Sequence, residues 1–187
     1  YGRGEAGGLL NINTKKPEWE SSSEVNLRTN SIEKYRASFE HTAPISDAVA
    51  YRIAVAHEDN QSFRDHVQSE RWFFSPQLTW KISDSTQLDF DSEFTRQDGT
   101  FDRGVSSYQK QFVMDPKTFT GEPDDGDHIQ KDHFYQLRLA HQFNDDWKMN
   151  NALSVKDTQL KGFSSEPRRI QSLSLIHISE PTRRTPI

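Results

Sequence analysis

The feature of this sequence that most limits its fold is a period-two alternation of side chains that recurs along the chain. From Tyr35 to Thr42, one set of side chains alternates with a smaller or more polar set, and the pattern returns over residues 49–56, 72–80, 88–94, 133–140 and 147–155. Successive side chains of a β-strand point to opposite faces of the sheet, so each run predicts a strand with two different faces. With a shorter run around Val25 and Leu27, the pattern predicts an all-β chain of about seven strands in series.

The connections between the predicted strands differ in length in a regular way. Short turns are expected at residues 44–47, 82–86 and 144–146, whereas residues 57–69 and 97–131 form long polar connections. Short turns at one end of the strands and long loops at the other are typical of outer-membrane β-barrels. A soluble β-sandwich need not show this asymmetry.

The four tryptophans favour the same arrangement. Trp19, Trp80 and Trp147 fall beside the expected turns, and Trp72 lies at the opposite end of its strand. Membrane barrels carry aromatic girdles at both interfaces. A soluble sandwich with an aromatic core also accounts for these residues and stays an alternative. Pro76 lies inside a predicted strand, where it removes a ladder hydrogen bond, and it predicts a β-bulge.

Composition excludes several classes of protein. No stretch of the 187 residues approaches the run of about 18 apolar residues that a membrane-spanning helix needs. The chain has no cysteine, which excludes disulfide scaffolds and cysteine-ligated metal sites. Its net charge is -5, and Lys and Arg are scattered among Asp and Glu, which argues against nucleic-acid binding.

No catalytic motif withstands inspection, and we expect no enzyme and no catalytic residues. Gly2, Gly4 and Gly7 satisfy G-x-G-x-x-G, but the residues that follow are strand-like, whereas a dinucleotide fingerprint must open a helix. The carboxylates of Asp89, Asp91 and Glu93 recur at every second position and therefore share one face. A polar, water-filled lumen explains them without catalysis.

An acidic cluster near the end of the longest connection is a candidate cation site. It comprises Asp124, Asp125, Asp127, His128 and His133. Carboxylate oxygens suit divalent cations such as Ca²⁺. The alternative is a solvated acidic loop without a metal, and this is the interpretation we expect.

Residues 1–17 read Tyr-Gly-Arg-Gly-Glu-Ala-Gly-Gly-Leu-Leu-Asn-Ile-Asn-Thr-Lys-Lys-Pro. This segment resembles the end of the plug domain in TonB-dependent siderophore receptors. The segments around Pro44-Ile45-Ser46-Asp47 and Trp80-Lys81-Ile82-Ser83 resemble the early barrel of that family. The resemblance implies a 22-stranded antiparallel barrel in the outer membrane, closed around a plug. The chain is then a fragment of such a receptor.

The resemblance also divides the chain into three parts. Residues 1–17 are the C-terminal end of the plug, and residues 18–171 are the first seven or so barrel strands. Residues 172–187 resemble translated adapter or vector sequence, and they are excluded from the fold. The plug motif consists of Gly2, Arg3, Gly4, Glu5, Gly7 and Gly8. We expect a structural role for it, because glycine permits positive φ and close backbone approach.

The function that the resemblance implies is uptake of a ferric siderophore across the bacterial outer membrane. The implied partners are the ferric siderophore, outer-membrane lipid, and TonB with ExbB and ExbD, which act through a segment upstream of this chain. Iron is carried as substrate, so no cofactor is expected. In that family, aromatic and basic loop side chains hold the chelate, and the loop 97–131 offers Phe101, Arg103 and Tyr108, beside Lys110 and Phe112.

Two alternatives remain open at this point. One is a soluble all-β binding or adhesion module, which explains the alternation but leaves residues 1–17 and the loop asymmetry as coincidence. The other is a siderophore receptor that also acts as a signal transducer, which only an additional domain before the plug would distinguish.

Overall fold

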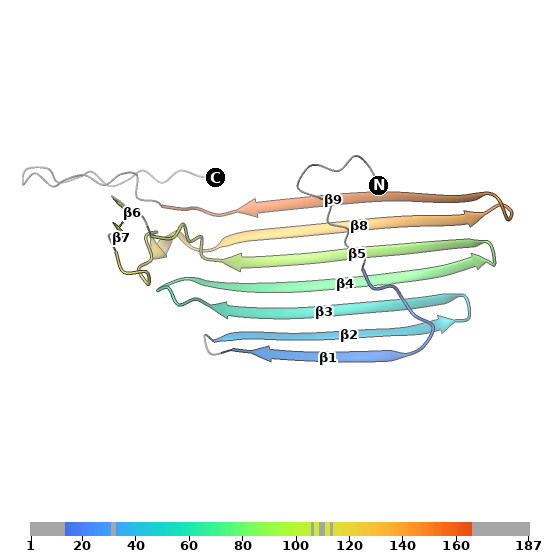
Figure 1. The fold of residues 1–187 in the computed structure, drawn as a ribbon, viewed down its shortest axis with the longest axis horizontal. Coiled ribbons are helices and arrows are strands. Elements are labelled where there is room, and N and C mark those ends of the chain that lie inside the picture. Colours follow the sequence, from blue (N-terminus) through green and yellow to red (C-terminus); the bar gives the residue numbers. More distant parts are fainter. Residues whose placement is uncertain (1–13, 31–32, 106, 109–110, 113, 166–187) are drawn as a thin grey trace, which may run out of the picture.

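A computed structural model describes residues 14–30, 33–105, 107–108, 111–112 and 114–165. Seven long strands form one antiparallel sheet in the order β1-β2-β3-β4-β5-β8-β9, as Figure 1 shows. Their bounds are β1 Ser22–Thr29, β2 Lys34–Ser46, β3 Val49–Gln61, β4 Gln68–Ser83, β5 Thr86–Gly99, β8 His128–Gln142 and β9 Lys148–Lys161. The predicted all-β chain of about seven strands in series is confirmed.

The connection between β5 and β8 carries the remaining regular structure. Two short strands, β6 Ser107–Tyr108 and β7 Gln111–Phe112, pair with each other, and a 3-10 helix covers Pro123–Asp125. In the part of the chain that the structure describes, no helix is long and apolar enough to cross a membrane.

The register gives the sheet two chemically different faces. Directly opposed residues share a face, so each face is a set of rows that cross the strands. One central row contains Thr42, Arg52, Gln77, Asp91, Gln136 and Ser154. The adjacent row, on the opposite face, contains Ala43, Tyr51, Leu78, Phe90, Leu137 and Leu153. We call these faces the polar face and the apolar face.

The burial of the two faces is the reverse of that in a soluble domain. Side chains buried on the polar face include Arg52, Gln77 and Asp91, whereas Leu78 and Leu137 of the apolar face are about 40% exposed, at 38% and 41%. In water, so wide an exposed apolar surface marks an interaction site. The sheet therefore needs a covering for its apolar face.

The strands are longer than the alternation predicted. The connection expected at residues 57–69 covers only residues 62–67, and the one expected at 97–131 covers residues 100–127. The turn expected at 44–47 lies at Asp47–Ala48, because β2 runs through Pro44 with a register shift before Ser46. These boundary predictions were wrong because both flanks of the long connections are polar, so hydrophobicity gives no signal of where pairing stops.

The bulge predicted at Pro76 is also wrong. Pro76 pairs with Ile53 in continuous register, and the ladder from β4 to β5 keeps one register on either side of Ser75 and Pro76 while leaving these two positions unpaired. The Ser92 hydroxyl donates a hydrogen bond to the Pro76 carbonyl at 3.1 Å. A proline cannot donate to the ladder, and the Ser92 hydroxyl gives the Pro76 carbonyl a donor where the pairing of β4 with β5 is interrupted.

The positions of the tryptophans agree with the predicted strand ends. Trp80 lies near the turn that joins β4 to β5, Trp147 directly precedes β9, and Trp72 lies near the opposite end of β4. The plug motif residues Gly2, Arg3, Gly4, Glu5, Gly7 and Gly8, and the tail 172–187, lie outside the described residues.

Candidate functional site: the polar face and the loop end of the sheet

Carboxylates and their partners line the centre of the polar face. Asp89 accepts hydrogen bonds from the Thr79 hydroxyl at 2.8 Å and from the Gln87 amide at 2.9 Å. The Arg138 guanidinium lies 2.6 Å from Asp91. The alternation that predicted a shared face for Asp89 and Asp91 is confirmed, and each carboxylate has a partner on a neighbouring strand or position.

The segment before β1 crosses this polar face, running obliquely over the strands in Figure 1. The Lys15 ammonium lies 2.7 Å from Glu40 and 3.2 Å from Glu24, and Lys16 reaches Asp89 at 3.8 Å. Pro17 is buried against the sheet. The hydrogen bonds to Glu40 and Glu24 raise the pKa of Lys15 above its usual value. Lysines of the segment are therefore paired with carboxylates of three strands.

Arg52 is the buried centre of this contact. It is 5% exposed, it forms an ion pair with Glu40, and it donates a hydrogen bond to the Lys16 carbonyl at 3.2 Å. Burying a charged guanidinium is costly unless its N–H groups find hydrogen-bond acceptors. Arg52 thereby joins strand β3 to the backbone of the crossing segment.

Trp19 fixes the other end of the crossing segment. Its indole N–H donates a hydrogen bond to the Asp47 carbonyl at 3.0 Å, and the Lys81 ammonium lies 3.6 Å from its ring centroid. The backbone N–H of Glu18 donates to the Thr42 hydroxyl at 2.9 Å. The chain is thus held at the turn end of β2, β3 and β4.

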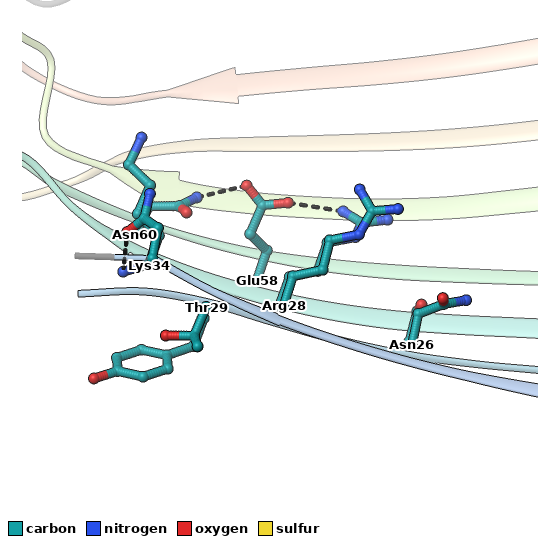
Figure 2. A pocket seen from close by; sticks show the side chains of 10 residues that line it. Asn26, Arg28, Thr29, Lys34, Glu58 and Asn60 are labelled. Carbon is teal, nitrogen blue, oxygen red and sulfur yellow. Dashed lines mark hydrogen bonds and ion pairs between the residues drawn. The ribbon is translucent and has the colours of Figure 1, made fainter. Parts of the chain in front are cut away.

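A polar pocket of about 520 Å³ lies at the loop end of the polar face, between β1, β2 and β3. Figure 2 shows Glu58 joined to Asn60 and to a guanidinium, with Arg28 alongside. The guanidinium belongs to Arg36, 2.7 Å from Glu58, and the Asn60 amide donates to Glu58 at 2.6 Å. Sequence reasoning missed this pocket, because alternation gives the face of each side chain but not the register that aligns Arg28 with Arg36.

The loops beyond the sheet gather aromatic and basic side chains. Phe101 stacks on His128 with ring centroids 4.5 Å apart, and the Arg103 guanidinium lies 4.8 Å from the Phe101 centroid. Arg64 of the β3–β4 connection pairs with Asp102 at 3.2 Å. The structure therefore brings the predicted Phe101 and Arg103 together, and it adds His128, which sequence reasoning assigned to an acidic cluster.

A second cavity of about 270 Å³ opens beside this aromatic group. Its lining includes His66, Phe101, Phe119, Asp125 and Phe163. Tyr108 lies in β6, and its side chain is outside the described residues. Among the described residues, no three His, Asp or Glu side chains are grouped to hold a metal ion. The arrangement offers aromatic surface and charge to a bound molecule.

Comparison with known proteins places these features in context. No family model matches the sequence. The chain is 32% identical over 169 residues to the metal-pseudopaline receptor of Pseudomonas aeruginosa. The aligned part makes up 89% of this chain and 24% of that receptor. It is 26% identical over 168 residues to the ferrioxamine B receptor of Salmonella typhimurium, covering 86% of this chain and 24% of the receptor.

Solved structures show the same fold. The siderophore receptor PiuA from Acinetobacter baumannii superposes with a TM-score of 0.75 at 15% identity, over 82% of this chain and 23% of that receptor. The ferric-catecholate import receptor Fiu from E. coli K12 superposes with a TM-score of 0.72 at 18% identity, over 81% of this chain and 25% of that receptor.

These relatives favour a receptor over a soluble binding or adhesion module. The chain spans about a quarter of the length of the curated relatives it matches. Its antiparallel sheet superposes on about a quarter of each of the two solved receptors. Over most of its length, the chain is similar to the TonB-dependent siderophore receptors of the bacterial outer membrane.

Proposed function

We propose that the chain is the junction between plug and barrel, together with the first wall strands, of a receptor that takes up a metal–siderophore chelate across the outer membrane. The observation that carries the proposal is the crossing segment. Lys15, Lys16 and Arg52 bind a chain segment onto the polar face and leave the apolar face open. A plug inside a lipid-embedded barrel requires this arrangement.

The unpaired edges of the sheet support a larger closed barrel. β1 and β9 end the seven-stranded order, so each offers one edge with no strand partner among the described residues. In lipid, an open edge leaves backbone polar groups without partners, and only closure removes it. Seven strands are roughly a third of a 22-stranded wall, the size that such plugged transporters have.

The proposed path of the substrate follows the polar face from its loop end. Phe101 and Arg103, with Tyr108 of the same connection, are the proposed contacts for the chelate, because flat aromatic rings and a cation suit a bulky anionic ligand. The pocket beside Arg28 and Arg36 lies further along the same face. Iron or another metal is cargo in this proposal, and the work is transport without a catalytic step.

Energy for transport is proposed to come from TonB with ExbB and ExbD, acting on the plug. The crossing segment is the point at which such a pull would reach the wall. Of its ion pairs, the one between Lys15 and Glu24 joins two side chains that are each more than half exposed. Exposed pairs contribute little each, which suits a contact that must rearrange.

The test is uptake of radiolabelled iron as a panel of purified ferric siderophores in the source organism. Deleting the gene should abolish uptake of one chelate, and the complete gene supplied on a plasmid should restore it. A strain that lacks TonB should behave like the deletion strain. Unchanged uptake of every chelate, together with recovery of the protein from the soluble fraction, would contradict the proposal.

A further inference from the structure

The loop end of the polar face carries more positive than negative charge. Four residues of β1 to β4 are successive cross-strand partners and therefore share one row of this face: Arg28, Arg36, Glu58 and Arg71. Lys34, two residues before Arg36 on the same strand, adds a fourth cation to the same face. Like charges in directly opposed positions, as at Arg28 and Arg36, destabilise a sheet. One carboxylate in this group faces four cations.

The single carboxylate of the group is already engaged. Glu58 is the one acidic residue among the described residues that line the pocket of about 520 Å³. It lies 2.7 Å from the Arg36 guanidinium, accepts a hydrogen bond from Asn60 at 2.6 Å, and interacts electrostatically with the charge on β4 opposite it. Arg28 and Lys34 line the same pocket and form no ion pair with any described residue. In Figure 2 their side chains lie on either side of Glu58.

Other carboxylates near this pocket do not supply the missing negative charge. Glu24 and Glu40, further along the polar face, pair with Lys15, and Glu40 also pairs with Arg52. Two further carboxylates lie on the apolar face, at Asp59 and Glu70. Glu33 is exposed and precedes the pocket. Counting it together with the carboxylate of the group sets two negative charges against four cations, so two positive charges remain.

A row of small side chains links this pocket to the aromatic contact in the loops. The row contains, from β2 to β8, Lys34, Asn60, Ser69, Gly99 and His128. His128 stacks on Phe101 at the far end of the row. Neighbouring strands are about 4.8 Å apart, so the four spacings set the two ends of the row about 19 Å apart. The three central residues are small, and a molecule lying over them can touch cations at one end and aromatic rings at the other.

We propose that this pocket binds free carboxylates of the transported chelate, so that the substrates are metal chelates bearing carboxylates besides their metal-binding groups. Guanidinium groups donate to carboxylates through a planar, bidentate fork. Hydroxamate and catecholate groups ligate the metal with their own oxygens and leave no free anion for Arg28. A volume of about 520 Å³ lies within the range of small-molecule sites. The inference rests on the proposed uptake function and names its substrate class.

The test uses the complete receptor in detergent micelles at low ionic strength. The probe is tricarballylate, and its uncharged triamide is the matched control ligand, with binding measured by isothermal titration calorimetry. Tricarballylate should bind, and the triamide should not.

The variant R28Q/K34Q removes two cations and leaves the pair of Arg36 with Glu58 in place. It should bind tricarballylate about 25-fold more weakly, since an exposed charge pair contributes up to about fivefold. The control variant K148Q/K161Q removes two cations from β9, at the opposite end of the strand order, and should bind as the wild type does.

Several results would overturn the carboxylate site. Equal affinity for the two probes, or equal loss in both double variants, excludes carboxylate recognition by Arg28 and Lys34. Displacement of tricarballylate by equimolar inorganic phosphate identifies a general anion site. A wild type that binds no tricarballylate, combined with a lower unfolding free energy of R28Q/K34Q, identifies an acidic group elsewhere in the receptor as the occupant.

Uptake of the chelate panel is scored separately from tricarballylate binding. Binding without uptake of any chelate would leave the carboxylate site standing and remove the proposed transport function. Uptake confined to chelates without a free carboxylate would leave transport standing and remove the proposed substrate class.

Discussion

At the scale of single residues, Arg52 shows how a buried charge holds two parts of the chain together. Its side chain lies between the Glu40 carboxylate and the Lys16 carbonyl, while a second arginine–glutamate pair on the same face, Arg36 with Glu58, is more exposed at 42% and 30% of the side chains. Removing one partner of a buried pair leaves an uncompensated group behind. The two pairs should therefore respond differently to truncation.

We predict that Arg52→Ala lowers the free energy of unfolding of the complete receptor by about 1–3 kcal/mol, because Glu40 loses a buried partner and the Lys16 carbonyl loses its donor. Arg36→Ala should cost only about 0–1 kcal/mol, as exposed pairs do. A urea titration of both variants in phospholipid vesicles measures the difference. Equal costs would show that Arg52 does not fix the segment.

Lys15 gives the crossing segment a dependence on pH. Hydrogen bonds to Glu40 and Glu24 raise its pKa above the usual value of a lysine in the folded chain. A raised lysine pKa adds stability that is fully present below the unfolded pKa and is lost as the pH rises through the folded pKa. The stabilisation should therefore be constant around neutral pH and disappear only in strong alkali.

The corresponding comparison is between the wild type and Lys15→Gln in the complete receptor. The difference in unfolding midpoint should stay constant around neutral pH and shrink only as the pH rises through the raised pKa of Lys15. Lys148, which has no ion pair among the described residues, provides the control variant Lys148→Gln, for which no such trend is expected. A difference that instead vanishes in acid would assign the effect to another group.

At the scale of strands, alternation predicts which face of the sheet each side chain occupies. That face decides how well a charged substitution is tolerated. Leu137 and Gln136 are neighbours on β8 but belong to opposite faces. Leu137→Arg should cost about 2–4 kcal/mol of unfolding free energy near the middle of a bilayer, whereas Gln136→Arg should cost far less. Refolding into vesicles over a urea gradient gives both values, and similar values would argue against a lipid-facing Leu137.

The sequence predicted the strands better than their ends, for a physical reason. From Val49 to Ala56 a large and a small face alternate, but β3 continues through His57 to Gln61, where both faces are polar. Pairing there is set by the partner β4, which no local pattern records. In the same way, the meeting of Phe101 with His128 depends on how β8 returns to the sheet, and the pocket at Arg28 requires the register of two strands.

At the scale of the whole molecule, the sheet is open on both sides in the part of the chain that the structure describes. β1 and β9 each expose one edge among the described residues. Exposed edges of long strands associate with other chains unless they are paired. We predict that the chain produced alone aggregates on removal of denaturant, while the complete receptor refolds in detergent and migrates differently on a gel before and after heating. A monodisperse, detergent-free isolated chain would contradict the account.

The central claim is that the apolar face meets lipid and the polar face meets the interior of a barrel. Spin labels placed one at a time along β5, in a cysteine-free form of the complete receptor in vesicles, test it most directly. Labels at Leu88, Phe90 and Phe94 should be accessible to oxygen dissolved in lipid, and labels at Asp89, Asp91 and Glu93 should not, giving a period of two. Equal accessibility of both sets to a water-soluble relaxation reagent would contradict the account.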